Sequence, residues 1–138
     1  MTVLRMGILA TVFASFLAAF AAPAAADHHT LGGTFTEQKK KIKGTWSIVE
    51  KDDGVYVMLS DDFKTRRAPD LKIFLSTKAA GDITGKNATD GSALVAELTS
   101  AKGGQSYKLP AGVTVDDYAS IVIHCEQYSV LWGAANLR

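Results

Sequence analysis

Apolar and polar residues alternate in short segments along most of the chain, which is the pattern of half-buried β-strands. In residues 71–76, for example, Leu71, Ile73 and Leu75 share one face of an extended strand. Similar segments, separated by Gly, Asp and Pro, predict strands at residues 32–36, 44–50, 55–60, 105–109 and 120–125. We therefore expect an all-β fold, a single β-sandwich or flattened barrel of about seven to eight mostly antiparallel strands.

The segments between the strands predict two kinds of connection. Asp52-Asp53-Gly54 is typical of a tight hairpin turn, because Gly accepts positive φ. Residues 77–92 form a longer polar loop that we expect at the rim of a binding site. Residues 93–98 suit either a strand or one turn of helix. We expect five aromatic side chains to supply most of the core: Trp46, Phe63, Phe74, Tyr107 and Trp132.

Residues 120–125 are the most strand-like stretch, and they end on the only cysteine of the chain. Ile123 and Cys125 lie two residues apart and so share a face, whereas His124 points to the other face. His124 is therefore expected to lie away from the thiol in space. The apolar positions then shift from odd to even numbers, as Val130 and Trp132 show, which predicts a bulge or bend near residues 126–127.

The first residues have the pattern of a secretory signal peptide. Arg5 precedes an apolar, Ala-rich run over residues 7–22, which is short for a membrane span, and Ala24-Ala25-Ala26 is a small-residue cleavage site. We expect residues 1–26 to be the signal peptide and residues 27–138 to be one secreted domain, located in the bacterial periplasm. No transmembrane segment is expected in the mature chain.

Charge narrows the choice of partner. Removal of Arg5 with the signal peptide leaves 14 basic and 14 acidic residues, so the mature chain is formally neutral. A neutral chain argues against a nucleic-acid or anionic-membrane partner, since both require a clustered basic surface. The lysine run over residues 39–43 is interpreted as a solvated strand edge, where lysines prevent pairing with other chains.

A single cysteine cannot form an internal disulfide, although secretion favours one. Cys125 is either buried core filler or a thiol that acts chemically, free or as a ligand. The sequence has no Gly-rich phosphate loop, Cys-x-x-Cys or nucleophile elbow, which argues against a stand-alone hydrolase or nucleotide enzyme. Covalent c-type haem is excluded by the missing motif, whereas non-covalent haem on Cys125 stays open.

Two metal sites are conceivable from the residues. Asp61, Asp62 and Asp70 could gather around calcium, although acidic turns are usually only solvated. Cleavage before Asp27 would expose Asp27-His28-His29, whose α-amine, two backbone amides and His29 imidazole can supply four nitrogens in a plane. That arrangement suits Cu(II) or Ni(II), and the alternative is a polar, frayed terminus.

An ordered set of segments resembles the DM-thirteen domain. The matching residues are Gly33-Thr34-Phe35, Leu59-Ser60-Asp61-Asp62-Phe63 before Ala68-Pro69-Asp70-Leu71, Phe74-Leu75-Ser76, Gly104-Gln105-Ser106-Tyr107-Lys108-Leu109-Pro110, and Ile123-His124-Cys125 through Gly133-Ala134 to Leu137. The resemblance implies a β-rich domain, found in animals beside DOMON domains, with an electron-transfer role. It assigns that role to Cys125, as a naked thiol or as a ligand to a prosthetic group such as haem. His124 stands where the family often has Trp.

The sequence thus leads to two functional hypotheses. In the first, the chain is a secreted domain with a redox or prosthetic-group-binding role centred on Cys125, working with an unidentified redox or protein partner. In the second, it is a non-catalytic binding or structural module in which Cys125 fills the core and the loop over residues 77–92 contacts a partner.

Overall fold

A computed structural model describes residues 28–37 and 41–138 of the chain. Within these residues the chain forms nine strands and two short 3-10 turns. The strands are β1 (His28–Gly33), β2 (Thr36–Glu37), β3 (Trp46–Lys51), β4 (Gly54–Leu59), β5 (Leu71–Ser76), β6 (Ser92–Glu97), β7 (Gln105–Lys108), β8 (Ser120–Cys125) and β9 (Val130–Asn136), and the turns are η1 (Ala80–Asp82) and η2 (Val115–Asp117). The same residues contain no helix with the length and hydropathy needed to cross a membrane.

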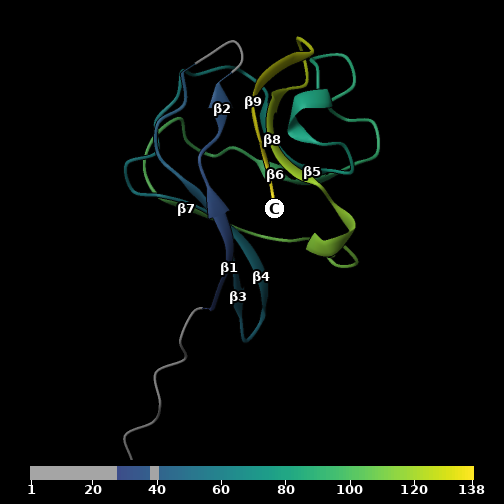
Figure 1. Cartoon of the computed structure of the whole chain (residues 1–138). Coiled ribbons are helices and arrows are strands. Elements are labelled where there is room, and N and C mark those ends of the chain that lie inside the picture. Colours follow the sequence, from purple (N-terminus) through teal and green to yellow (C-terminus); the bar gives the residue numbers. More distant parts are fainter. Residues whose placement is uncertain (1–27, 38–40) are drawn as a thin grey trace, which may run out of the picture.

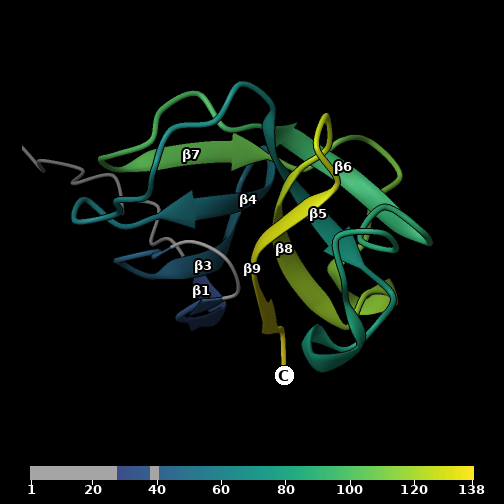
Figure 2. The same cartoon turned by 90° about the horizontal axis from the view of Figure 1, so that it is seen from above.

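The strands form two antiparallel sheets that pack face to face. One sheet has the order β1-β3-β4-β7, and the other has the order β2-β9-β8-β5-β6. Figure 1 shows the sheets from the side, and Figure 2 shows them from above, with β7, β4, β3 and β1 in one layer and β6, β5, β8 and β9 in the other. The fold is therefore a β-sandwich, as the alternating pattern predicted.

Side chains from the inner faces of both sheets fill one core. On β3, Trp46 and Ile48 point inward and are 2% and 1% exposed, which confirms the alternation read from the sequence. On β8, Ile121, Ile123 and Cys125 face them and are equally buried. Of the five aromatic residues expected in this core, Trp46, Phe63, Tyr107 and Trp132 lie in it.

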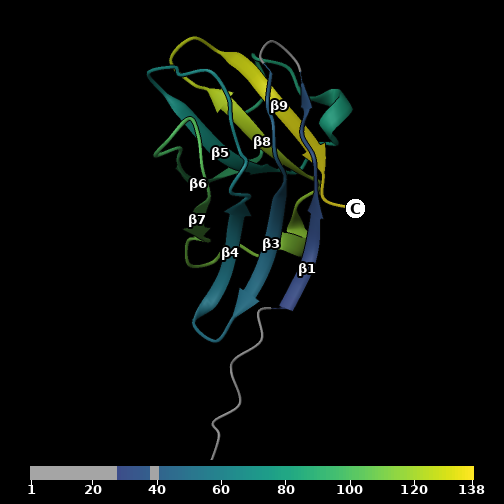
Figure 3. The same cartoon turned by 90° about the vertical axis from the view of Figure 1, so that its left-hand side faces the viewer.

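Phe74 belongs instead to a second apolar cluster on the outer face of the five-stranded sheet. There it packs with Val122, Leu131 and Ala134, and the loop over residues 77–91 covers them with Ile83 and Ala88. Figure 3 shows the 3-10 turn of this loop beside β9. The loop thus buries apolar side chains as well as presenting polar ones, and its expected place at the rim of a binding site stays a prediction.

Two of the turns expected from the sequence lie within the described residues. The hairpin at Asp52-Asp53-Gly54 is confirmed, and Gly54 has a φ of 143° that a residue with a side chain rarely adopts. The bend expected near residues 126–127 is a complete reversal instead, since residues 126–129 form the turn of the β8–β9 hairpin. The register shift lies inside the ladder, where Ile123 pairs with Gly133 and His124 pairs with Leu131, so Trp132 is the extra residue of a bulge.

Candidate functional site

Cys125 is the last residue of β8 and lies on its inner face. It pairs with Leu71 of β5 on one side and with Val130 of β9 on the other. Its side chain is 1% exposed and carries a free thiol. The thiol is therefore at one end of the core, where β8 gives way to the hairpin turn, and strand pairing fixes its position from both sides.

Cys125 lines part of a depression at this end of the sandwich. The depression measures about 420 Å³ and is lined by Arg67, Ala68, Pro69, Cys125, Tyr128, Val130 and Trp132. Its walls are mostly apolar, and Tyr128 is 62% exposed although it is a large aromatic residue. The arrangement places the sulfur at the floor of an apolar depression, close to the surface but covered. Sequence reasoning had assigned none of the lining residues except Cys125 to a site.

One wall of the depression is held by a chain of hydrogen bonds. The Trp132 indole Nε1–H donates to the Thr65 hydroxyl at 2.8 Å, and that hydroxyl donates to the Lys41 carbonyl at 3.1 Å. Trp132 is also the extra residue of the bulge in β9, so the bulge and this hydrogen bond involve the same residue. The segment between β4 and β5 is thereby fastened to the five-stranded sheet beside Cys125.

His124 lies on the opposite face of β8 from Cys125, as expected. Its ring is 2% exposed and lies edge-on to Phe74, with the ring centroids 6.3 Å apart. Burial lowers the pKa of the imidazole, although the charge of Glu126 opposes this effect. Its Nδ1 atom has no hydrogen-bond partner among the described residues. His124 therefore cannot serve as a base for the thiol.

An ion-pair network holds the turn that follows Cys125. Lys72 Nζ lies 2.6 Å from a Glu126 carboxylate oxygen and 3.2 Å from an Asp70 oxygen, and these hydrogen bonds raise the pKa of Lys72. The second Asp70 oxygen accepts the Gln127 backbone N–H at 2.9 Å. These contacts anchor the start of β5 to the turn, so the floor of the depression is braced on this side as well.

The predicted calcium ligands do not come together. Asp70 is engaged with Lys72 and Gln127, while Asp62 accepts a hydrogen bond from Ser60 at 2.6 Å. Residues 28–37 and 41–138 contain no group of three or more His, Cys, Asp or Glu side chains that could hold a metal ion. The calcium hypothesis therefore loses its geometric basis.

The predicted copper site is not tested by the structure. Asp27 lies outside the described residues, and only the backbone of His28 and His29 is described. That backbone begins β1, where His28 pairs with Glu50 and His29 pairs with Val49 of β3. A metal bound through the amides of both histidines would compete with this pairing, because it needs the same two residues.

The surroundings of Cys125 do not fit a haem ligated by this residue. An axial sulfur must stand at the face of the macrocycle, whereas Cys125 is 1% exposed between its neighbours in the sheet. The depression is lined by no imidazole or thioether, and the nearest histidine in the chain, His124, faces away. The lining thus offers the covered Cys125 sulfur and the exposed Tyr128 hydroxyl, and the covered sulfur is better suited to remain a thiol.

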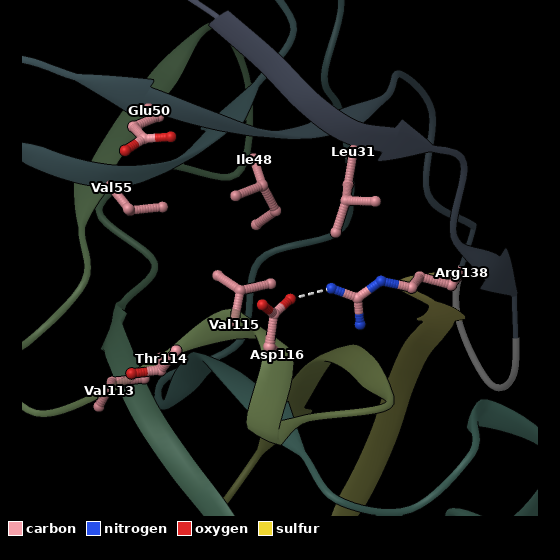
Figure 4. Close-up of a pocket in the computed structure, with 9 residues that line it drawn as sticks. All are labelled: Leu31, Ile48, Glu50, Val55, Val113, Thr114, Val115, Asp116 and Arg138. Carbon is pink, nitrogen blue, oxygen red and sulfur yellow. Dashed lines mark hydrogen bonds and ion pairs between the residues drawn. The ribbon is translucent and has the colours of Figure 1, made fainter.

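A second cavity, of about 500 Å³, lies at the other end of β8 (Figure 4). Its walls are polar and apolar in similar measure, and two apolar side chains, Ile48 of β3 and Val115 of η2, point toward each other across the space. Arg138 and Asp116 form an ion pair at its rim, and Glu50 lies at the far side. This cavity has the size and lining of a small-molecule pocket, but it is remote from the thiol.

The chain was compared with known families and proteins. Searches of the curated proteins and of the solved structures found no match. The family model described as "Electron transfer DM13" matches residues 34–137, which include every strand from β2 to β9 and Cys125. The match covers most of the chain, and the chain therefore belongs to the electron-transfer DM13 family.

Proposed function

We propose that this chain is an electron-transfer domain whose redox group is the thiol of Cys125 itself. The observation that carries the proposal is the placement of the only cysteine at the floor of an apolar depression. Membership of a family described by electron transfer supports the same role. The poor fit to haem favours a naked thiol over a prosthetic group.

Thiol–disulfide exchange is the chemistry that a single thiol can perform. Cys125 loses its proton to solvent, and its sulfur attacks one sulfur of a partner's disulfide. A new S–S bond forms as the old one breaks, and the second partner sulfur leaves as a thiolate that takes up a proton. In this mixed disulfide the Cys125 sulfur is oxidised and the leaving partner sulfur is reduced, each by one oxidation level, and full two-electron reduction of the partner requires a second thiol. Because the chain has no second cysteine, the mixed disulfide persists until an external thiol attacks it.

Access to the sulfur controls this reaction. The thiol is covered in the closed structure, so exchange requires the side chains over it to move. Tyr128 and Val130 belong to the hairpin end of β8 and β9, and hairpin ends open locally at less cost than the whole fold. We expect a slow, selective thiol that reacts when a partner or a fluctuation opens the depression.

The expected signal peptide places this function outside the cytoplasm, and we propose the bacterial periplasm. An oxidising compartment supplies disulfides with which a lone thiol can exchange. The domain is then a carrier that works with a redox protein, rather than a stand-alone enzyme.

Alkylation kinetics test the proposal. Native protein is treated with iodoacetamide across a series of low urea concentrations, and modification of Cys125 is followed by mass spectrometry. We expect labelling through local opening, with a rate that depends weakly on urea. A rate that follows global unfolding at every urea concentration would show that Cys125 is core filler. An absorbance spectrum of protein from its own host should show no haem band.

The cavity in Figure 4 favours a second candidate function, a non-catalytic module that binds a small ligand with both apolar and polar groups. In that case the thiol would have no role, and Cys125→Ala would retain full function. Replacing Val115, whose side chain projects into the cavity, with Trp would abolish ligand binding. Loss of function in Cys125→Ala would support the redox role, whereas loss of function in Val115→Trp would support ligand binding in the cavity.

A further inference from the structure

Three lysines stand side by side on neighbouring chain segments. Lys43 and Lys64 exchange backbone hydrogen bonds of 2.8 and 3.1 Å, and Lys64 forms a second antiparallel bridge with Lys102. Residues directly opposite in such a ladder present their side chains on the same face, with Cβ atoms about 4.5–5.5 Å apart. All three side chains are exposed. We name Lys43, Lys64 and Lys102 the basic row.

Two more basic residues lie on the same chain segments as the basic row. Ile42 and Phe63 are buried, so the residues beside them in the chain face outward. Lys41, next to buried Ile42, and Arg66, two residues after Lys64, are both exposed. The described residues give the row one ion pair, in which Lys43 Nζ lies 4.0 Å from Asp62.

Protection of a strand edge does not explain the whole basic row. Lysines do blunt sheet edges, and this was the interpretation of the run over residues 39–43. Lys64, however, has a bridging partner on each side, so it is not at an edge. Like charges placed directly opposite each other destabilise a ladder. Edge protection can therefore account for Lys43 and Lys102 but not for the central Lys64, whose like-charge contacts cost stability, and this points to an anionic partner.

The basic row and the depression over Cys125 are connected by one chain segment, because Arg67, which lines the depression, follows Lys64 by three residues. Thr65 and Arg67 belong to the same segment as Lys64, and Thr65 accepts the hydrogen bond from Trp132 while Arg67 lines the depression. An apolar hollow with an exposed tyrosine, Tyr128, thus adjoins a charged border. An apolar centre with a charged rim is the anatomy of a protein–protein interface.

We propose that the basic row and the depression together form the docking surface for an acidic face of a redox protein, and this inference rests on the proposed electron-transfer function. Transient redox complexes are small and depend on electrostatic steering, which fits a row of exposed charges. A basic row alone could also bind a nucleic acid or an anionic membrane. The hollow beside the row additionally fits an apolar side chain projecting from a folded partner.

Binding of a synthetic peptide tests this surface. The probe is a short fluorescent peptide with glutamates on both sides of two leucines, and the matched probe carries glutamines instead. Anisotropy at low ionic strength should show binding of the acidic probe that weakens steeply with salt. We expect Lys64→Glu to reduce its affinity by about tenfold or more, whereas Lys86→Glu, an equal charge change at an exposed residue of the loop over residues 77–91, should change it by less than about twofold.

Stability measurements keep the result interpretable. Lys64→Glu removes the like-charge contacts of the basic row, so its urea midpoint should equal or exceed that of the wild type. Equal affinity for both probes, an equal loss in both variants, or stronger binding to phosphatidylglycerol vesicles or duplex DNA would overturn the proposal. Thiol exchange of Cys125 with glutathione disulfide is measured in parallel. If exchange fails while Lys64→Glu still abolishes peptide binding, the electron-transfer function is wrong and the docking surface stands.

Discussion

His124 and Cys125 are adjacent in the chain, yet their side chains lie on opposite faces of β8. The Cys125 thiol lies in the core between the sheets, whereas the His124 ring packs on Phe74 beneath the loop over residues 77–91. The two residues therefore respond to different perturbations. Titration of the imidazole reports on the apolar cluster around Phe74, and reactivity of the thiol reports on the depression.

Stability should fall as the pH is lowered from about 6.5, the ordinary pKa of histidine. Burial lowers the pKa of His124 in the folded state, so the unfolded chain binds a proton first as the pH falls. As the pH falls from 6.5 to the lowered pKa, protonation of the unfolded chain progressively reduces the free energy of unfolding that is present above pH 6.5. Urea unfolding at a series of pH values measures this slope.

His124→Phe is the variant that isolates this effect, because it keeps an aromatic ring in the cluster and removes the titrating group. Its stability should vary less between pH 7 and pH 5 than that of the wild type. Carboxylates titrate mainly below this range, so His124 is expected to account for the slope. An unchanged slope in the His124→Phe variant would show that other groups cause the pH dependence.

Replacement of Cys125 with Ser should lower the free energy of unfolding by about 1–3 kcal/mol, because a hydroxyl buried without a partner costs that much. Cys125 is 1% exposed, which leaves the hydroxyl little access to water. Cys125→Ala is the matched control, since it removes the sulfur without adding a polar group. Identical urea midpoints for the Ser variant and the wild type would contradict the burial of this side chain.

Thr65→Val should both destabilise the fold and expose the thiol. The substitution keeps the shape of the side chain but leaves the buried Trp132 Nε1–H without its acceptor, which costs about 1–3 kcal/mol. Because this hydrogen bond holds one wall of the depression, alkylation of Cys125 should become faster. Thr77→Val, at an exposed position in another loop, is the control. Unchanged labelling in the Thr65 variant would show that the wall does not control access.

Mature protein that begins at Asp27 should bind about one Cu(II) through its amino terminus, as four-nitrogen sites of this type do. Visible absorbance during titration measures the uptake, and His29→Ala should abolish it. Binding should also increase amide exchange along β1, where His28 and His29 pair with β3. Mass spectrometry establishes the first residue. Protein that begins at Asp27 and takes up no copper would refute the site.

Much of the fold was predictable because alternation records which face of a strand is buried. Residues 71–76 have the bounds of β5 in the structure, and Trp46 points inward as its spacing from Ile48 indicated. The segment 93–98 was ambiguous because its apolar residues suit a helical turn as well, and pairing of β6 with β5 decides for a strand. The pattern of apolar residues within one segment does not determine which distant strand that segment pairs with.

The surroundings of the site were harder to predict for the same reason. A change from odd to even apolar positions is compatible with a bend, a bulge or a complete turn, and the chain uses both a turn and a bulge at Trp132. Lys43, Lys64 and Lys102 lie in three separate segments, so only strand pairing brings them into one row. Cys125 could be singled out because it is unique, but Arg67, Ala68 and Pro69, which line the depression with it, come from a distant segment.

The claim that Cys125 is the redox group is tested most directly by the intact mass of native protein incubated with glutathione disulfide. We expect one glutathione to be added, the adduct to map to Cys125, and dithiothreitol to remove it. Cys125→Ser should remain unmodified under the same conditions. If native protein gains no adduct in a time that fully modifies the same chain unfolded in urea, the thiol is inert and the account is contradicted.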